Sequence, residues 1–387
     1  MRNKIVFVSD TFHHHQRGVA DALYELTNGA YCFITIKPLR EERLKMGFAN
    51  EYPNYVLDTS SKTDEIMTKA QHIIDEAEVV VLGSAPFSFL KQRLSDKKLT
   101  FRYSERLWKQ YKHYVKTPIY MFDNYRTRGC YLLCSSAFAS HDYNAMGAFK
   151  GRCYKWGYFT AVPQEKVLNK TKDVSTIHIM WCSRFLDWKH PELPIYLAKN
   201  LKERGHRFCI DMFGSGQYLN ASKVLASKLN VSDIVHFTGN TSNAKILEAM
   251  GQCDIFLFTS DRREGWGVVA NEAMSNGCVL VANNEIGSVP YLVNDGENGY
   301  TFHSSSRCYG FNRFGVSVDT KALNSLTEKV EWLFSHPNNR VEIAQNAYNT
   351  MNTTWNPRQA ATNLLTLIED IRQGRETSIA YGPCSKA

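Results

Sequence analysis

The chain has 387 residues, of which 43% are hydrophobic and 22% are charged, and its formal net charge is +8. This length accommodates two domains of ordinary size, and the composition is that of a soluble globular protein. No apolar run approaches the roughly 18 residues that a membrane span needs, and no opening stretch resembles a signal peptide. The ten cysteines form no CxxC pair, so we expect free thiols and a cytoplasmic protein.

Short apolar runs alternate with helix-compatible stretches in the first half of the chain. This order is typical of βαβ units around a parallel sheet, so the fold class is expected to be α/β. The predicted strands of this half are residues 5–8, 32–36, 79–82, 119–122 and 131–134.

Three consecutive histidines, His13, His14 and His15, follow the first predicted strand. A loop at the carboxyl end of a parallel strand is where α/β sheets bind ligands, so these side chains could contact phosphate or an acceptor. A metal cluster is not expected, because three adjacent side chains cannot all point in one direction. The alternative is that one histidine caps or packs and the other two are solvated.

The segment Lys91–Arg128 carries eleven basic and three acidic residues. Within it, "FRYSERLWKQYKHYVK" repeats a basic residue every three or four positions among aromatics, at Arg102, Arg106, Lys109, Lys112 and Lys116. Basic residues at helical spacing among aromatics favour an anionic membrane surface as a partner. The alternative is a solvated helix whose aromatic side chains face the core. Nucleic acid is not expected, because the chain contains no recognisable binding module.

A polar, lysine-rich stretch at residues 162–174 predicts a linker, and a second series of apolar runs follows it. These runs predict strands at residues 177–182, 208–213, 234–237, 255–258 and 279–282. Near the end, "WNPRQAATNLLTLIEDI" predicts a helix with Asn356 as its N-cap and Pro357 in its first turn. Its apolar stripe is Leu364, Leu365, Ile368 and Ile371.

The stretch "DRREGWGVVANEA" at residues 261–273 follows one of these strands and carries two carboxylates. Glu264 lies in the turn, and a helix beginning near Gly265 would put Glu272 about 12 Å away at roughly 1.5 Å per residue. The N-terminus of that helix would attract an anion. Two carboxylates beside an anion site fit a ligand with hydroxyls at both ends and a charged middle, which is the layout of a nucleoside diphosphate sugar.

Basic residues follow the strand that ends at Cys182, in "SRFLDWKHPE". The guanidinium of Arg184 offers a planar fork to a pair of phosphates, and Lys189 adds a compact charge. The alternative for these residues is a salt bridge with Asp187 at the rim.

Glycine turns follow the next two strands. Gly214 and Gly216 lack side chains, which lets backbone N–H groups approach a phosphate. A dinucleotide-binding pattern would need a third glycine at position 219, which is Leu219. Gly239, in the turn after the following strand, is suited to a backbone contact with a nucleobase.

Four elements of the second half, taken together, resemble the donor-binding domain of retaining glycosyltransferases of family 4, which have the GT-B fold. They are "SRFLDWK", "MFGSG", "IVHFTGN" and "EGWGVVANEAMSNGCVLVANNEIGSVPYLVNDGENGYTF", in family order over residues 176–303. The resemblance implies two Rossmann-like domains that face each other across a cleft. The expected boundaries are residues 1–160 for an acceptor-binding domain, 175–355 for a nucleotide-sugar-binding domain, and 356–372 for a helix that packs back on the first domain.

The resemblance also implies roles for single residues. Arg184 and Lys189 would hold the donor diphosphate, and Glu272 would bind the ribose hydroxyls. Glu264 would bind the sugar together with the backbone of Gly265, Trp266, Gly267 and Val268. The expected catalytic residues are Arg184, Lys189 and Glu264, and the donor expected is a UDP- or GDP-sugar.

The first half is similar, through "HHHQ", "FRYSER" and "YKWGYF", to bacterial surface-polysaccharide glycosyltransferases. Relatives often carry a first-domain histidine near the reacting carbon; the corresponding segment here is "RYSER", so Glu105 or Ser104 takes its place in our prediction. Acceptor contacts are expected from His13, His14, His15 and Glu105.

The sequence thus predicts a retaining glycosyltransferase that transfers a sugar to a glycan or lipid-linked acceptor. The expected location is the cytoplasm, with peripheral attachment of the protein to the inner face of the plasma membrane as an option. We expect no cofactor and no metal, because the chain has no Asp-x-Asp element. The alternatives are a GT-B sugar-nucleotide epimerase and a non-catalytic scaffold of a polysaccharide assembly complex.

Overall fold

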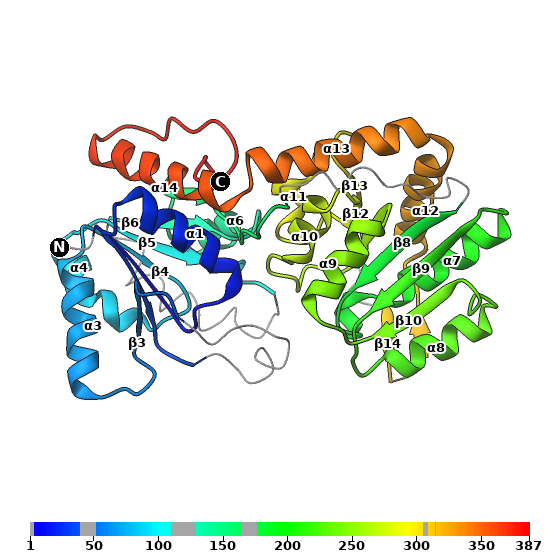
Figure 1. Cartoon of the computed structure of the whole chain (residues 1–387), viewed down its shortest axis with the longest axis horizontal. Coiled ribbons are helices and arrows are strands. Elements are labelled where there is room, and N and C mark those ends of the chain that lie inside the picture. Colours follow the sequence, from blue (N-terminus) through cyan, green and yellow to red (C-terminus); the bar gives the residue numbers. More distant parts are fainter. Residues whose placement is uncertain (1–3, 39–51, 110–128, 164–175, 305–308, 314) are drawn as a thin grey trace. The chain divides into compact units, whose positions relative to one another are not determined.

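The computed structural model describes residues 4–38, 52–109, 129–163, 176–304, 309–313 and 315–387 (Figure 1). The chain divides into two compact units. Unit 1 consists of Met1–Ala161 and Thr354–Ala387, and unit 2 consists of Val162–Thr353.

Unit 1 is built on a seven-stranded parallel sheet in the order β3-β2-β1-β4-β5-β6-β7. Its strands are β1 (Ile5–Ser9), β2 (Tyr31–Thr35), β3 (Val56–Asp58), β4 (Val79–Leu82), β5 (Thr100–Ser104), β6 (Cys130–Cys134) and β7 (Cys153–Lys155). Its helices are α1 (His14–Leu26), α3 (Asp64–Glu76), α4 (Lys91–Ser95), α6 (Ala139–Ala145) and α14 (Pro357–Arg372), with a 3₁₀ turn η1 (Phe87–Leu90).

Unit 2 is built on a six-stranded parallel sheet in the order β10-β9-β8-β11-β12-β13. The strands are β8 (Ile177–Cys182), β9 (Phe208–Phe213), β10 (Val235–Gly239), β11 (Ile255–Phe258), β12 (Val279–Asn283) and β13 (Tyr300–Phe302). A separate hairpin pairs β14 (Gly310–Asn312) with β15 (Gly315–Ser317). The helices are α7 (Glu192–Glu203), α8 (Leu219–Lys228), α9 (Asn243–Gln252), α10 (Val269–Ser275), α11 (Val289–Leu292), α12 (Thr320–Ser335) and α13 (Pro337–Thr353), with a 3₁₀ turn η3 (Asp187–Lys189).

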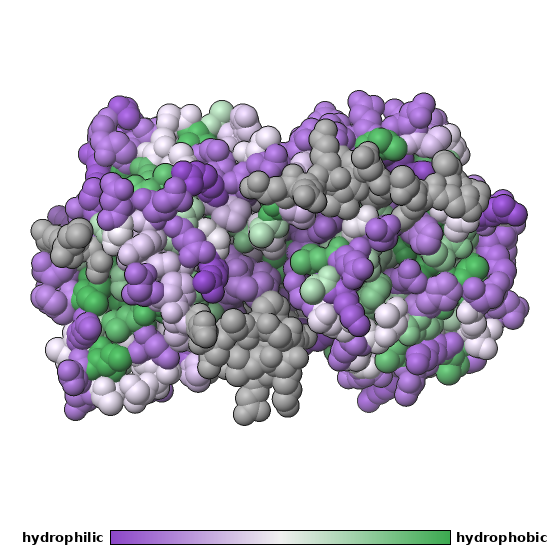
Figure 2. Space-filling view, viewed as in Figure 1, coloured by the Kyte–Doolittle hydropathy of each residue, from purple (hydrophilic) through white to green (hydrophobic). Residues whose placement is uncertain are grey.

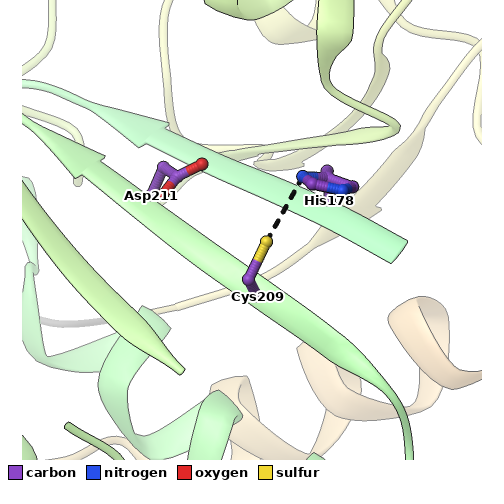
Figure 3. A group of neighbouring side chains, drawn as sticks. All are labelled: His178, Cys209 and Asp211. Atoms are coloured by element: carbon purple, nitrogen blue, oxygen red, sulfur yellow. Dashed lines mark hydrogen bonds between the residues drawn. The ribbon is translucent and has the colours of Figure 1, made fainter. Parts of the chain in front are cut away.

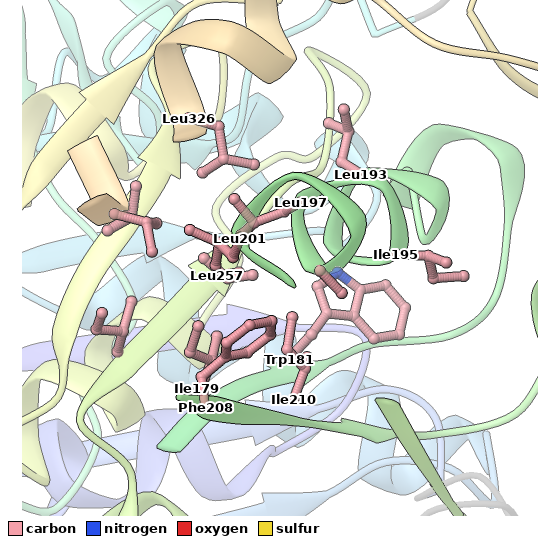
Figure 4. Packing of buried hydrophobic residues seen from close by; sticks show 14 of the residues in the cluster. Ile179, Trp181, Leu193, Ile195, Leu197, Leu201, Phe208, Ile210, Leu257 and Leu326 are labelled. Atoms are coloured by element: carbon pink, nitrogen blue, oxygen red, sulfur yellow. The ribbon is translucent and has the colours of Figure 1, made fainter. Parts of the chain in front are cut away.

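Both sheets have the doubly wound strand order, in which the chain reverses direction across the sheet after its third strand. The α/β prediction is therefore confirmed. The predicted strands within the described residues are all present, to within one or two residues at each end, and the predicted strand 119–122 lies outside those residues. Apolar side chains of β8, β9 and β11 pack with those of α7, and Trp181, Ile210 and Leu257 lie in this layer (Figure 4).

The final helix, α14, packs against α1 of unit 1. The predicted cap is present, because the Gln359 N–H donates to Asn356 Oδ1 at 2.8 Å. The two helices approach so closely that a Cβ on Gly18 would lie 2.7 Å from Pro357 Cγ. Of the predicted stripe, Leu364 and Ile368 are buried, while Leu365 and Ile371 are only half-buried.

The described part of the basic segment Lys91–Arg128 does not form the helix that the spacing of Arg102 and Arg106 indicates. Residues 100–104 form strand β5 in the middle of the sheet, and residues 110–128, with Lys112 and Lys116, lie outside the described chain. Arg93 is buried and donates to the Ile74, Ala77 and Leu99 carbonyls. Arg106 is also buried, 3.6 Å from an Asp142 carboxylate oxygen. Part of the positive charge in this segment is thus used inside the fold and is not displayed to a membrane.

The visible surface is mainly hydrophilic, with hydrophobic residues in small patches over the described part of this face (Figure 2). Among the described residues, four large hydrophobic side chains are exposed, namely Val224, Tyr309, Val341 and Tyr381. Among the helices that the structure describes, none has the combination of length and apolar composition that spanning a bilayer requires.

Candidate functional site

Strands β8 and β11 are hydrogen-bonded neighbours at the point where the strand order of unit 2 reverses. In doubly wound sheets the loops that leave the carboxyl ends of two such strands diverge to opposite faces, and a ligand-binding crevice lies between them. The loop after β8 carries Arg184 and Lys189, and the loop after β11 carries Glu264. The topology therefore brings together three residues that the sequence singled out separately.

Lys189 and Glu264 form an ion pair between these two loops, in which the lysine Nζ donates to a carboxylate oxygen. Their side chains are only 10% and 13% exposed. Burial lowers the pKa of Lys189, and the nearby Glu264 carboxylate opposes that shift. The Lys189 ammonium also lies 4.1 Å from the centre of the Trp188 ring. Asp187, the alternative partner, instead accepts from Arg263 Nη1 at 2.7 Å.

A hydrogen-bonded chain from the core of unit 2 fixes the backbone of Lys189. The indole N–H of Trp181, which is 1% exposed, donates to Thr259 Oγ1 at 2.9 Å. The Thr259 hydroxyl in turn donates to the Lys189 carbonyl at 2.7 Å. Because Thr259 directly follows β11, this chain links the ends of β8 and β11 beneath the ion pair.

A buried charge cluster that sequence reasoning missed also joins the two loops. His190 is 1% exposed and has a left-handed backbone with φ of 50°. Its Nδ1 lies 2.7 Å from Glu192 Oε1, and its Nε2 lies 3.5 Å from Asp261 Oδ2. Burial alone would lower the pKa of His190, but the Glu192 and Asp261 carboxylates outweigh it and raise that pKa to about 9. The only sequence signal for this cluster is the density of charged residues after two apolar strands.

Arg184 and Glu272 complete the group of charged side chains near the crevice. Arg184 is exposed, and its charge contributes to the lowered pKa of Lys189. Glu272 is 9% exposed. Burial raises the pKa of the Cys182 thiol to about 12, with Glu272 raising it further and Lys189 lowering it. Glu272 and Lys189 therefore both lie within electrostatic range of the end of β8.

The geometry of Gly214 and Gly216 gives these glycines a packing function. A Cβ on Gly214 would lie 2.0 Å from the Ser183 carbonyl oxygen, and one on Gly216 would lie 2.6 Å from the Phe185 carbonyl oxygen. The Gly214 N–H donates to the Gly239 carbonyl at 2.8 Å. That N–H is therefore used between loops, which differs from the phosphate contact that we expected of it.

The helix after Glu264 begins later than predicted. Its first residue is Val269, so Gly265–Val268 form a loop, and the 12 Å estimate for the separation of the two carboxylates does not apply. The helix has seven residues, too short for the strong N-terminal dipole that we expected. Trp266 is fully buried, and its indole N–H donates to Asn271 Oδ1 at 2.8 Å. The Trp266 side chain is therefore part of the core.

In unit 1, the histidines His13–His15 lie partly on a helix rather than on a loop. His13 precedes α1, its N–H donates to Gln16 Oε1 at 3.0 Å, and its Nε2 lies 2.6 Å from Thr11 Oγ1. His14 and His15 belong to the first turn of α1, and their ring centres are 3.5 Å apart. His13 thus occupies the N-cap position, as the alternative interpretation expected of one histidine, whereas His14 and His15 are half-buried rather than solvated.

Two of the predicted acceptor residues come together around Tyr158, which sequence reasoning did not single out. The Tyr158 hydroxyl donates to Glu105 Oε1 at 2.8 Å, and its ring stacks on that of His15 with 6.0 Å between centres. The second Glu105 oxygen accepts from Lys109. His15, Tyr103 and Tyr158 line a small pocket with mainly aromatic walls. Burial raises the pKa of Tyr158 well above its usual range, so its hydroxyl is protonated at neutral pH.

Comparison with known proteins covers the charged residues of unit 2 described above. Residues 164–307 match the family model for "Glycosyl transferases group 1", a range that contains Arg184, Lys189, Glu264 and Glu272. A curated relative from Streptococcus pneumoniae, the GtfA subunit of the UDP-N-acetylglucosamine–peptide N-acetylglucosaminyltransferase, is 26% identical over 133 residues. This alignment covers 33% of the present chain and only 22% of the relative.

Solved structures match nearly the whole chain at low sequence identity. HepE from Anabaena, crystallised in complex with UDP, superposes with a TM-score of 0.70 and 13% identity, covering 95% of this chain and all of that one. A glycosyltransferase from Rickettsia africae superposes with a TM-score of 0.62 and 14% identity, covering 95% and 98%. The chain therefore has the GT-B fold, and its second unit carries a segment that matches the group 1 glycosyl transferases.

Proposed function

We propose that this protein is a retaining, metal-independent glycosyltransferase that uses a nucleotide sugar, a UDP- or GDP-sugar, as its donor. The observation that carries the proposal is the Lys189–Glu264 ion pair at the reversal point of the unit 2 sheet, with Arg184 and Glu272 nearby. Cations and carboxylates lie near one another at this end of the sheet, which suits a ligand with a charged middle and hydroxylated ends.

Each of these side chains has a role in the proposed complex. Arg184 and Lys189 bind the donor diphosphate, and Glu272 accepts hydrogen bonds from the ribose hydroxyls. Glu264, together with the backbone of Gly265–Val268, binds the sugar. The ion pair keeps Lys189 charged in a site where burial alone favours the neutral amine. The arriving diphosphate then takes over as its counterion.

The proposed catalytic step is the departure of the nucleoside diphosphate, which builds negative charge on the leaving phosphate. Arg184 and Lys189 stabilise this charge where it develops, so a metal ion is not needed for that purpose. Retention of the anomeric configuration rests on the family resemblance of residues 176–303. No nucleophile for a double displacement is assigned.

We further propose that the acceptor is a glycan or a lipid-linked glycan of a surface polysaccharide, bound by unit 1. The contacts among His15, Tyr158 and Glu105 support this assignment, because aromatic side chains beside a few polar groups suit a sugar ring. Attachment to an anionic membrane through Lys91–Arg128 is part of the same proposal. It concerns the exposed lysines of that segment, because Arg93 and Arg106 are buried.

A thermal-shift screen of the full chain against UDP-, GDP- and dTDP-sugars tests donor binding. A donor that stabilises the protein is then assayed for transfer after exhaustive EDTA treatment, with NMR of the anomeric proton of the product. A retained configuration without added metal supports the proposal. Activity that only Mg²⁺ or Mn²⁺ restores would remove metal independence, and an inverted product would remove retention.

The same assay separates the two alternatives. An epimerase converts the nucleotide sugar with no acceptor present, whereas a transferase requires the acceptor. A non-catalytic scaffold binds none of the nucleotide sugars. Arg184, Lys189, Glu264 and Glu272 are all in place, which favours an active enzyme over a scaffold.

A further inference from the structure

A group of metal-ligand side chains lies on one face of the unit 2 sheet and takes no part in the proposed reaction. His178 on β8 and Cys209 on β9 are opposite each other in the parallel register, and Asp211 lies two residues beyond Cys209. Side chains two residues apart in a strand point to the same face, so all three project together (Figure 3). On the opposite face, Phe208 and Ile210 belong to the hydrophobic core.

The three ligand atoms are already close to a metal-binding arrangement. His178 Nδ1 and Cys209 Sγ are 3.3 Å apart, and all three ligand atoms lie within 4.8 Å of one another. Ligands of a tetrahedral Zn²⁺ ion are separated by about 3.5 Å, given metal–ligand distances of roughly 2.0–2.3 Å. The three residues are half-buried, so small side-chain rotations are sterically open to them.

A fourth residue orients the carboxylate. His236 on β10 is opposite Asp211 in the register, and its Nδ1 lies 3.0 Å from Asp211 Oδ1. This contact leaves the second oxygen of Asp211 for an ion, while His236 fixes the direction of the carboxylate. Partners of this kind, which hold a ligand without touching the metal, are a common feature of metal sites.

The chemistry of the group selects the class of ion. A thiolate and an imidazole are borderline-soft ligands that favour Zn²⁺ or Co²⁺, whereas Mg²⁺ and Ca²⁺ prefer sites made of oxygen alone. The group also lies apart from the donor crevice. His178 and Cys209 are the second residues of their strands, and the donor loops leave the opposite ends.

We propose that His178, Cys209 and Asp211 bind a divalent transition-metal ion, Zn²⁺ in the first instance, with water in the fourth position. The ion cross-links β8 and β9 on the sheet face opposite Phe208 and Ile210, beside the edge strand β10. Its role is to stabilise unit 2 rather than to take part in sugar transfer. This proposal does not depend on the proposed function.

Cobalt spectroscopy of the full chain tests the site. Titration of the metal-stripped protein with Co²⁺ is expected to produce a thiolate-to-cobalt charge-transfer band that saturates at one equivalent. Cys209→Ser should abolish the band. Cys182→Ser, which changes another half-exposed cysteine of the same strand pair, should leave it intact. Histidines 13–15 cannot give this signal, because imidazole alone does not produce a thiolate band.

Zinc competition with a chromophoric chelator supplies the second measurement. His236→Gln should weaken Zn²⁺ binding about 10- to 100-fold, as expected for the loss of an orienting partner. Asp211→Asn keeps the side-chain shape and should weaken binding at least about 10-fold, which provides a test even where Cys209→Ser is unstable. In the wild type, Zn²⁺ but not Mg²⁺ should raise the Tm.

Three results would overturn the proposal. The first is the absence of a thiolate band in the wild type, and the second is a band that survives in Cys209→Ser. The third is Zn²⁺ affinity unchanged in Asp211→Asn. The test stays separate from that of metal-independent transfer, because that test uses the response to Mg²⁺ and Mn²⁺, which a thiolate-containing site binds poorly.

Discussion

Lys189 and Glu264 form an ion pair although 75 positions separate them in the sequence. Each residue lies in the loop that follows one of two neighbouring parallel strands, so the pairing of the strands brings the two residues together. Removal of one partner from a buried pair leaves the other charge uncompensated, and the cost is large. A diphosphate between Arg184 and Lys189 would supply a new anionic partner in the proposed complex. When no ligand is bound, the ion pair therefore favours the charged form of Lys189, which burial alone would disfavour.

The first prediction concerns turnover. Lys189→Ala should lower kcat about 100-fold or more while weakening binding of the intact donor much less, because the charge that Lys189 meets grows during bond cleavage. Steady-state kinetics and equilibrium titration of the donor measure the two quantities. Lys202→Ala is a matched control, since Lys202 pairs with Asp233 on the surface of the same unit. Equal losses in binding and turnover would contradict a role in the transition state.

The second prediction concerns Glu272. If this carboxylate accepts hydrogen bonds from a ribose diol, Glu272→Ala should cost ~1.5–3 kcal/mol, or roughly 10- to 150-fold in donor affinity. Free nucleoside diphosphate should lose affinity to the same degree, because the ribose contact does not involve the sugar. Calorimetric titration of both ligands provides the comparison, with Glu248→Ala on the exposed side of α9 as the control. Unchanged nucleotide affinity would be incompatible with the ribose assignment.

The strands of both sheets could be predicted largely because strands of parallel sheets are buried on both faces and appear as continuous apolar runs. β8, β9 and β11 have their predicted bounds. β5 was missed because Arg102 and Tyr103 lie within it, which made the run resemble part of a basic, aromatic helix. Short strands such as β3 and β7, with three residues each, have too little pattern to be recognised.

The candidate site was predictable residue by residue but not as an arrangement. Local sequence identified Lys189 and Glu264 as separate ligand contacts, whereas their pairing depends on strand order. The same holds for His190, whose partner Asp261 lies on another loop. For Gly214, the sequence predicted a close approach but not the group that makes it. The group is the Ser183 backbone rather than a phosphate.

The third prediction separates the glycines by their surroundings. Gly214→Ala should destabilise the protein by more than about 2 kcal/mol, because φ is +121° and the new Cβ would lie 2.0 Å from the Ser183 carbonyl oxygen. Gly239→Ala should cost only about 1 kcal/mol, since φ is +76° but nothing lies within 4 Å of the new Cβ. Urea denaturation of both variants measures the difference. Similar losses in the two would argue against backbone packing as the reason for Gly214.

The last prediction is a pH dependence of stability that originates at His190. The Glu192 and Asp261 carboxylates overcome the effect of burial and raise the folded-state pKa to about 9, against an unfolded value of about 6.5. Between these values the folded state holds a proton that the unfolded state releases. The stabilisation is therefore complete below about pH 6.5 and is lost as pH rises through about 9, and it amounts to about 3 kcal/mol at most.

Urea denaturation across this pH window tests the assignment by difference, because other groups also titrate there. The free energy of unfolding of the wild type minus that of His190→Gln should shrink as pH rises from about 6 to about 9. The variant should be less stable at low pH, since Glu192 and Asp261 then lose their shared cationic partner in a buried site. His206→Gln, which removes a histidine paired with Glu331, serves as the control and should leave most of the slope in place.

A pH profile of His190→Gln that runs parallel to that of the wild type would show that His190 does not carry this proton. Loss of the slope would instead establish that a protonated His190 holds the Lys189 and Glu264 loops together at neutral pH.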